Sequence, residues 1–337
     1  MSHNLVLLTG ATGLVGFRVL TELLERQYKV RLAVRSEAKI KAIEEALASK
    51  YAAAVHELEF IIVPDMVVDH AFDDAVKGVK YIVHVASPMA VPSDDLETTL
   101  VKPAINTTVS ILISALTEPG LKKMVITSSV AAVLPTAAPK VFDADNVEPN
   151  PQGPWTHTFS AYVASKKLAL SATRRFIADS DPHFDIINIM PAFVIGPNGF
   201  ARGKEDYEQG SNRAALAPLR GVEFPEPRPG IVCHVDDVAF VHVAALDPEI
   251  SGHRNFGVAY NGPDGIEWDA AIEIVKRRLP ELVERGVFPL GGTVVTQKVP
   301  FDASKTERAL GIKFKTFEDM IVDVANEFAR VVSEVSA

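Results

Sequence analysis

A short apolar segment that ends at glycine and leads into a helical pattern constrains the fold of this chain more than any other feature. Residues 4–9 form the apolar segment, and residues 9–16 read TGATGLVG. Apolar side chains then recur at helical spacing over residues 14–27. The chain therefore opens with a strand, a tight turn and a helix, and three glycines lie where the strand meets the helix.

Each glycine of this turn has a physical role in binding an anion. Gly10 permits the tight turn, Gly13 lets a pyrophosphate approach the backbone, and Gly16 lets the helix pack closely on the strand. The N–H groups and the dipole of the helix N-terminus face the same anion. We therefore predict a dinucleotide-binding turn, with a plain strand-to-helix turn as the alternative. Its predicted cofactor contacts are Gly10, Thr12, Gly13, Leu14, Val15 and Gly16.

Strands and helices alternate along the rest of the first 190 residues. Continuous apolar runs predict strands at 29–34, 60–63, 81–85, 124–127 and 186–190. Helical spacing predicts helices at 38–47, 71–76, 96–116 and 162–178, the third interrupted by Pro103. Strands that are apolar throughout belong to a parallel sheet covered by helices on both faces. The predicted fold class is α/β, with a Rossmann-type doubly wound parallel sheet.

The composition of the sequence changes after Pro191: proline, glycine and charged residues dominate residues 196–230. We therefore predict a dinucleotide-binding domain over residues 1–190 and a smaller substrate-binding region over residues 191–337. The segment 231–246 returns to an apolar pattern and is expected to rejoin the main domain. An amphipathic helix over residues 317–335 is expected to close the chain.

Composition excludes several classes of protein. The chain has 337 residues, and 34 Lys and Arg against 43 Asp and Glu give a net charge of −9, which argues against a nucleic-acid partner. No apolar run reaches the ~18 residues of a membrane helix, so no membrane partner is expected. The one cysteine, Cys233, cannot form an intramolecular disulfide, and no Cys/His spacing indicates a metal site. We expect a cytoplasmic protein.

The end of the second predicted strand indicates which dinucleotide is bound. A chain that prefers NAD places an acid there to accept from the ribose 2′-OH, whereas this chain has Val34-Arg35. Arg35 and Lys39 would suit a 2′-phosphate, because a guanidinium binds phosphate in a bidentate fork and a lysine adds a point charge. The sequence therefore predicts NADP(H) as cofactor. The alternative is that both are solvated surface charges.

Two further segments fall at the carboxyl edge of the predicted sheet. Asp65 is placed to accept from an adenine amine and Met66 to pack on the ring, although a loop-capping role for Asp65 is the alternative. Ala86, Ser87 and Pro88 follow the fourth strand, where small residues let a cofactor approach.

A third group of residues has the composition of a proton-transfer site. Tyr162 and Lys166 are four residues apart near the start of a predicted helix and therefore share a face. Ser128-Ser129 end the preceding strand. A phenol with its ordinary pKa of ~10 needs a nearby positive charge to act near neutral pH, and Lys166 supplies one. The Ser129 hydroxyl would polarise a carbonyl.

Together these motifs resemble the extended short-chain dehydrogenase/reductase family. Within it, the chain is most similar to the branch of dihydroflavonol reductases, cinnamoyl-CoA reductases and fungal aldehyde or methylglyoxal reductases. The resemblance covers nearly the whole chain and rests on the glycine turn, residues 83–88 (VHVASP), 127–129 (TSS), 162–166 (YVASK) and 190–197 (MPAFVIGP).

This resemblance implies an NADPH-dependent carbonyl reductase that converts an aldehyde or ketone to an alcohol. Tyr162 would be the general acid, Lys166 would tune it and hold the nicotinamide ribose, and Ser129 would polarise the carbonyl. Arg35 and Lys39 match the 2′-phosphate contacts of this branch. The remaining implied cofactor contacts are Thr127, Ser128, Pro191 and Val194. The implied partner is a small carbonyl substrate, and the chain is expected to be a monomer or a homodimer.

The chain departs from the family pattern in one place. Many members use an asparagine in the fourth helix to relay protons to bulk water, and this chain has Pro103 at the aligned position. Asn106 lies one turn later, and a water held by backbone carbonyls is the alternative route. Two other functions stay open: a nucleotide-sugar epimerase or dehydratase of the same fold, and a non-catalytic NADP-sensing regulator.

Overall fold

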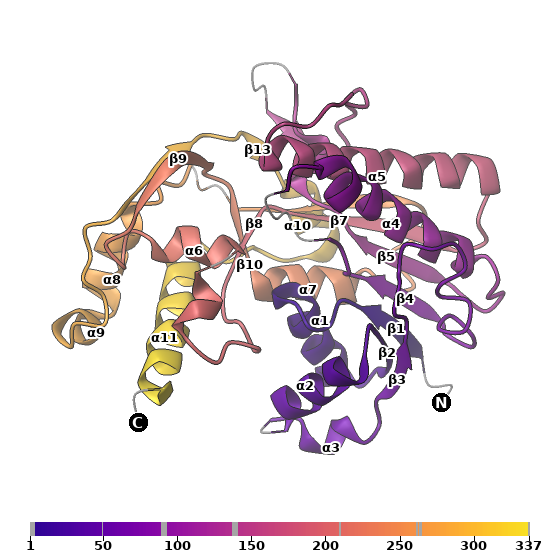
Figure 1. Cartoon of the computed structure of the whole chain (residues 1–337), viewed down its shortest axis with the longest axis horizontal. Coiled ribbons are helices and arrows are strands. Elements are labelled where there is room, and N and C mark those ends of the chain that lie inside the picture. The colour runs from indigo at the N-terminus through magenta and orange to yellow at the C-terminus, as the bar shows by residue number, and fades with distance from the viewer. Residues whose placement is uncertain are drawn as a thin grey trace. The chain divides into compact units, whose positions relative to one another are not determined.

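The computed structural model describes residues 4–48, 50–88, 93–136, 141–208, 210–260, 262 and 265–335 (Figure 1). Contacts divide the chain into two compact units. The first comprises Met1–Ala137, Ala144–Met190 and Ala239–Phe256, and the second comprises Ala138–Asp143, Pro191–Val238 and Gly257–Ala337. Among the described residues, no helix is both long and apolar enough to cross a membrane.

The first unit is built on a seven-stranded sheet with the strand order β11-β7-β5-β4-β1-β2-β3. Its strands are β1 (Leu5–Thr9), β2 (Lys29–Val34), β3 (Glu59–Ile62), β4 (Tyr81–His84), β5 (Lys123–Thr127), β7 (Asp185–Pro191) and β11 (Arg254–Val258). Its helices are α1 (Leu14–Glu25), α2 (Glu37–Leu47), α3 (Ala52–Val55), the π-helix η1 (Glu97–Val101), α4 (Lys102–Ala115), the 3₁₀ helix η2 (Val130–Val133) and α5 (Thr158–Ser180). Helix α7 (Val235–Ala244) contains residues of both units.

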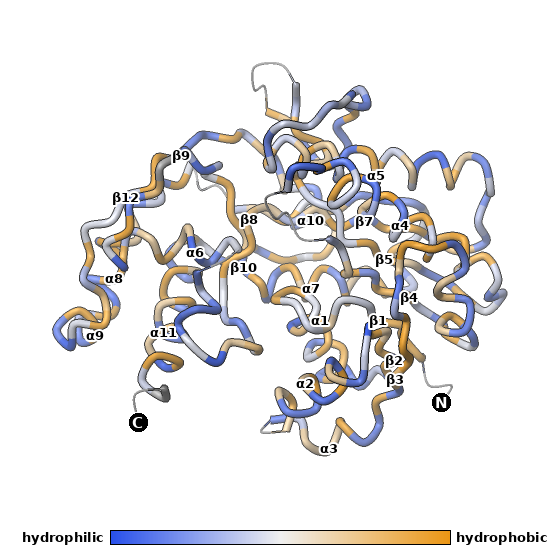
Figure 2. The backbone as a smooth tube through the Cα atoms, in the orientation of Figure 1, coloured by the Kyte–Doolittle hydropathy of each residue, from blue (hydrophilic) through white to orange (hydrophobic). Residues whose placement is uncertain are grey.

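Parallel pairing brings the ends of the central strands to one edge. Strand β1 pairs in parallel with β2 and β4, and β4 pairs in parallel with β5. In this register Thr9 lies opposite both Ala33 and His84. The strands are apolar along their length (Figure 2), as expected of strands that are buried on both faces. The α/β fold class with a parallel central sheet is thereby confirmed, and the segments that follow these strands share one edge.

The predicted helix at 71–76 is wrong. Residues 69–78 form successive turns, with hydrogen bonds such as Asp73 N–H to the His70 carbonyl at 3.2 Å. Phe72 and Val76 are fully buried, so the spacing that suggested a helix reflects real burial. His70, however, has a φ of +65°, which a right-handed helix cannot contain.

The predicted helix at 96–116 is divided into two parts. The π-helix η1 ends at Val101, and α4 begins at Lys102 with Pro103 in its first turn. A proline is tolerated there, because the first turn of a helix leaves its N–H groups without intrahelical acceptors. Helix α4 packs along α5.

The second unit has its own apolar core. Its strands pair in parallel as β6 (Phe142–Asp143) with β13 (Phe301–Asp302), β8 (Phe193–Ile195) with β10 (Val232–His234), and β9 (Glu223–Pro229) with β12 (Thr293–Gln297). Its helices are η3 (Lys204–Tyr207), α6 (Gly210–Leu216), α8 (Ala270–Arg278), α9 (Pro280–Glu284), α10 (Ser304–Leu310) and α11 (Phe317–Val335). The fully buried Trp268 and Tyr207 pack in this core with Met320 of α11. Cys233, in β10, is also fully buried.

Candidate active site

The turn between β1 and α1 has no space for side chains at two of its glycines. Gly10 has a φ of +78°, and a Cβ on it would lie 2.6 Å from the backbone nitrogen of Ala86. A Cβ on Gly16 would overlap the carbonyl oxygen of Gly10. The turn is therefore folded tightly on itself and against the segment that follows β4, as the sequence predicts for a turn that holds a phosphate against the backbone.

Helix α1 begins directly at this turn. Gly13 is its N-cap residue, with an extended backbone and an N–H that donates to the Gly10 carbonyl at 3.1 Å. The next N–H groups, of Leu14, Val15 and Gly16, have no acceptor within the helix. No acidic side chain lies in the first turn. Thr12 is half-buried beside them. These groups would therefore favour an anion by hydrogen bonding and by the helix dipole.

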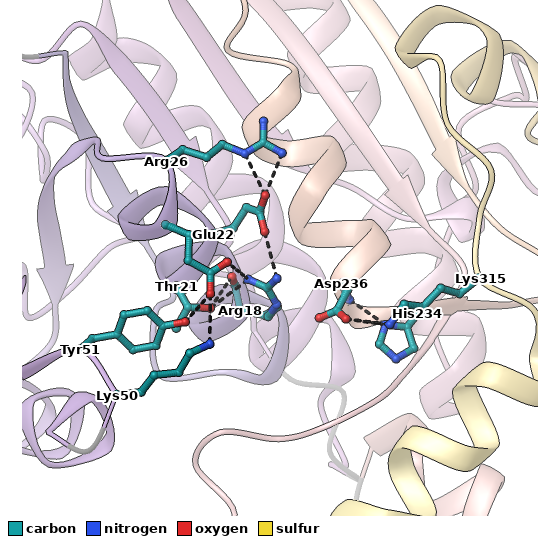
Figure 3. Close-up of polar contacts among 10 residues, drawn as sticks. Arg18, Thr21, Glu22, Arg26, Lys50, Tyr51, His234, Asp236 and Lys315 are labelled. Atoms are coloured by element: carbon teal, nitrogen blue, oxygen red, sulfur yellow. Dashed lines mark hydrogen bonds and ion pairs between the residues drawn. The ribbon is translucent and has the colours of Figure 1, made fainter.

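Helix α1 is held along its length by ion pairs (Figure 3). The buried carboxylate of Glu22 accepts from Arg18 at 2.9 Å and from Arg26 at 2.7 Å. Further along the helix, Glu25 accepts from Lys50 at 3.3 Å and from the Tyr51 hydroxyl. These contacts fix the helix on which the glycine turn depends.

Two cationic side chains, those of Arg35 and Lys39, follow β2 and have no partner among the described residues. Arg35 and Lys39 are exposed, and neither side chain has a hydrogen bond or ion pair within the described part of the chain. Arg31, four residues earlier in β2, differs because it pairs with Glu59 at 2.7 Å. The guanidinium of Arg35 and the ammonium of Lys39 are therefore available to an external anion, which is the property that a 2′-phosphate contact requires.

The residues predicted to bind an adenine have internal roles in the structure. The Asp65 carboxylate accepts from the backbone N–H of Val67 at 3.0 Å, which is the loop-capping geometry. Met66 is 6% exposed and packs in the core of the first unit, and its carbonyl accepts from the Thr107 hydroxyl at 3.0 Å. Adenine binding by this pair stays a prediction.

Lys166 brings together two of the predicted segments. Its Nζ donates to the Ser87 hydroxyl at 2.9 Å and lies 5.6 Å from the ring centroid of Tyr162. Both Tyr162 and Lys166 come from α5, whose 3.6-residue repeat places them on one face. The Tyr162 side chain is half-buried and packs against the apolar cluster of Leu96, Leu100, Val101 and Ala161. The phenol and the ammonium of the predicted pair are therefore neighbours, next to the segment Ala86, Ser87 and Pro88 that follows β4.

The predicted serines lie at the end of β5. Ser129 is the N-cap residue of η2, where its hydroxyl accepts from the Ala131 N–H at 3.1 Å, and η2 packs against α5. The Ser128 N–H donates to the Ile189 carbonyl at 2.7 Å, and the Thr127 hydroxyl bonds His242 at 2.7 Å. Ser129 is thus placed on the element that contacts the helix of Tyr162. The contacts of Thr127 and Ser128 to a cofactor stay predictions.

Pro191 and Val194 belong to the second unit. Pro191 ends β7, and Val194 lies in β8, where its carbonyl accepts from the Ser211 hydroxyl. Their predicted position beside a nicotinamide is not tested by these contacts and stays a prediction. Asn106, the alternative relay amide, is exposed on α4.

His84, in β4, is a neighbour of this site. It is 2% exposed, its Nδ1 lies 2.9 Å from the Thr9 hydroxyl, and its Nε2 has no hydrogen-bond partner among the described residues. Burial, together with the charge of Lys166, lowers the pKa of His84 to about 3. The imidazole is therefore neutral, and it lines a cavity that Lys166 and Ser87 also line. The only sequence signal was its polar ring within an apolar strand.

A cluster in the second unit has the composition of a metal site but contains its own cation (Figure 3). Ligand atoms of His234, Asp236 and Asp323 lie within 4.8 Å of one another. The Lys315 ammonium lies 2.8 Å from Asp236 and 3.2 Å from Asp323. Because this ammonium already pairs with both carboxylates, the cluster is a salt-bridge network that joins the start of α7 to α11.

The neighbouring Asp237 gives a testable effect on stability. It accepts from the Lys315 N–H at 2.8 Å, and burial raises its pKa to about 6. The folded state therefore holds a proton that the unfolded state has lost, so this carboxyl destabilises the fold increasingly as pH rises from about 4 to about 6. Asp237→Asn is expected to stabilise the protein by up to about 3 kcal/mol above pH 6 and to have little effect near pH 4.

Urea unfolding at a series of pH values measures this effect. Asp236→Asn is the matched control, because it removes the partner of the Lys315 ammonium and is expected to lower the urea midpoint at neutral pH. Equal gains for Asp237→Asn at pH 4 and at pH 7.5 would show that the carboxyl is ionised in the fold throughout.

Known proteins are similar to this chain over nearly its whole length. The family model described as the NAD-dependent epimerase/dehydratase family matches residues 6–259. Ketoreductase CTB6 of Cercospora nicotianae is 36% identical, over 97% of this chain and 96% of the relative. The NAD-dependent epimerase/dehydratase ALT6 of Alternaria alternata is also 36% identical, over 95% of this chain and 96% of the relative.

Two solved structures have the same fold as this chain. Gre2 of Candida albicans, solved as a complex with NADPH, matches with a TM-score of 0.79 and 22% identity, over 97% of this chain and 99% of that chain. Vestitone reductase of alfalfa matches with a TM-score of 0.71 and 22% identity, over 97% of this chain and 98% of that chain. At these identities the likeness extends to the fold alone.

Proposed function

Because the chain belongs to the NAD-dependent epimerase/dehydratase family, we propose that it is an NADPH-dependent reductase that converts a ketone or an aldehyde to an alcohol. The observation that carries this proposal is the position of the Lys166 ammonium, 2.9 Å from the Ser87 hydroxyl and 5.6 Å from the ring of Tyr162. A phenol beside a fixed positive charge is suited to give up a proton, which reduction of a carbonyl requires.

The residues present fit a bound NADPH. The backbone at Gly10 and Gly16 is packed so closely that a Cβ at either position would meet other backbone atoms, and this leaves a tight turn for a pyrophosphate. The unpaired cations Arg35 and Lys39 would hold a 2′-phosphate, and Lys166 would hold the nicotinamide ribose. When bound, NADPH supplies a hydride to the carbonyl carbon and is left as NADP⁺.

The side chains of this chain supply the other half of the reaction. The hydroxyls of Ser129 and Tyr162 would donate hydrogen bonds to the substrate oxygen and so polarise the carbonyl. Tyr162 would then transfer its proton to that oxygen, which completes the alcohol. The Lys166 ammonium would stabilise the phenolate that remains until solvent returns the proton.

Of the two proposed substrate classes, we favour ketones over aldehydes. The relatives CTB6, sphI and azaE are each named ketoreductases, at identities from 29% to 36%. The epimerase or dehydratase alternative fits less well, because those reactions retain NAD, and this chain has the exposed Arg35 where an acid would bind the 2′-OH.

The test is the consumption of NADPH, with NADH in parallel, in the presence of ketones, β-ketoesters, α-dicarbonyl compounds, aldehydes and dihydroflavonols. Selective oxidation of NADPH by one class, with stoichiometric formation of its alcohol, is the expected result. If NADPH binds but no carbonyl compound is reduced, the reductase proposal fails and nucleotide sugars become the next substrates to test.

A further inference from the structure

A small cavity lies beside Lys166 inside the first unit. It measures about 20 Å³, which exceeds the roughly 10–15 Å³ that one water molecule requires. Strands β4, β5 and β7 and helices α4 and α5 contribute to its lining. Of the side chains that line it, His84 and Lys166 are the two titratable ones. The cavity therefore has room for one water next to His84 and Lys166.

His84 offers this cavity an unused hydrogen-bonding atom. The Thr9 hydroxyl oxygen accepts from the Ala86 N–H at 3.1 Å, so its own proton is free to be donated to His84 Nδ1 at 2.9 Å. This assignment places the ring proton on Nε2, the nitrogen that lacks a partner among the described residues. A buried N–H without an acceptor is costly by about 1–3 kcal/mol, and a water would remove that cost.

Two threonines supply acceptors to the same cavity. The Thr108 hydroxyl donates to the Ala104 carbonyl at 3.0 Å, and the Thr173 hydroxyl donates to the Ala169 carbonyl at 3.1 Å. Each hydroxyl has used its single proton and keeps lone pairs on its oxygen. A water can donate to such oxygens while it accepts from an N–H. The cavity wall thus contains both kinds of partner that a buried water needs.

Lys166 completes the set of donors. An ammonium carries three protons, and the structure assigns one of them to the Ser87 hydroxyl at 2.9 Å. Lys166 is 8% exposed, so bulk water is a poor source of further acceptors. Since Lys166 lines the cavity, a water there could accept a second proton.

We propose that the cavity holds one buried water that bridges Nε2 of His84 to Nζ of Lys166, and that His84 is thereby a positioning residue for the ammonium beside Tyr162. The kinetic consequence rests on the proposed reductase function, whereas the water site does not. The bridge keeps the ammonium directed at the phenol.

The neutrality of His84 is part of this arrangement. Burial is the main cause that lowers its pKa, to about 3, and the Lys166 charge adds to it. An imidazolium at this position would repel the ammonium. A neutral ring can donate to the water without competing for the charge that stabilises the phenolate.

Kinetics of the His84 variants test the positioning role. In His84→Leu the water loses its donor, and NADP⁺-linked oxidation of the product alcohol is expected to slow by about 10- to 100-fold. The acid limb of its pH profile is expected to move up by about one pH unit, because the phenolate loses part of its stabilising charge. His84→Gln, whose amide can donate to the same water, is expected to restore most of the oxidation rate and to return the acid limb close to its wild-type position.

The control variant is Phe72→Leu. Phe72 is fully buried and meets the His84 ring edge-on at 6.2 Å between centroids, but it does not line the cavity. Its replacement is expected to lower thermal stability and to leave the pH profile unchanged. A wild-type profile in His84→Leu, or the same displacement in Phe72→Leu, would overturn the positioning role.

A high-resolution crystal structure of the full chain tests the water directly and needs no substrate. The expected density is one water within hydrogen-bond distance of both His84 Nε2 and Lys166 Nζ. Absence of that density would overturn the bridge. If the wild-type chain reduces no carbonyl compound while the water is present, the proposed function fails and the water site stands.

Discussion

Tyr162→Phe is expected to lower kcat for carbonyl reduction by about 10²- to 10⁴-fold while NADPH still binds. The substitution removes only the phenolic oxygen. The ring remains packed against the cluster of Leu96, Leu100, Val101 and Ala161, and Lys166 keeps its bond to Ser87. The loss should therefore appear in the chemical step, since the hydride acceptor no longer receives a proton from the enzyme.

The measurement is single-turnover NADPH oxidation, with NADPH affinity from fluorescence titration. Tyr81→Phe is the matched control, because Tyr81 is a tyrosine at the start of β4, 3% exposed and remote in sequence from α5. It should reduce substrate at the wild-type rate. Substantial turnover by the Tyr162 variant would assign proton transfer to another group.

Arg35→Asp is expected to reverse the cofactor preference. The guanidinium is exposed and has no partner within the described ranges, so its removal leaves the fold intact and takes away only an external contact. A charge-assisted bond to a phosphate contributes enough that kcat/KM for NADPH should fall by about 10- to 100-fold. The new carboxylate would repel the 2′-phosphate and accept from the 2′-OH of NADH, whose kcat/KM should rise.

Lys41→Asp is the control for this experiment. Lys41 is exposed on α2, two residues after Lys39 and six after Arg35. Lys41→Asp therefore makes the same change of net charge as Arg35→Asp at a nearby position. Its cofactor preference should stay that of the wild type. Equal effects of the two variants would mean that NADPH responds to the general field of α2 and not to a contact with Arg35.

The strands and the glycine turn were predictable because their causes are local. A parallel strand buried on both faces is apolar throughout, and β2 was predicted at Lys29–Val34, where it is found. Gly10 and Gly16 can be identified from sequence because no other residue fits a turn that closes on its own backbone. Tyr162 and Lys166 are neighbours because both belong to one helix.

The features that escaped prediction depend on contacts between distant segments. Whether the two nitrogens of His84 are satisfied depends on Thr9, 75 residues away, and on helices α4 and α5. The turns at 69–78 bury the same apolar side chains that a helix would bury, and only the backbone of His70 distinguishes them. The burial of Met66 in the core is likewise not visible in a loop sequence.

The burial of Cys233 has a consequence for the chemical durability of this protein. It is the one cysteine of the chain, it is fully buried in β10, and burial raises the pKa of its thiol. Thiolates, not thiols, react with electrophiles and peroxides, so this sulfur is protected both by access and by protonation. A reductase that meets enones, dicarbonyl compounds or other thiol-reactive substrates could therefore process them without being alkylated at sulfur.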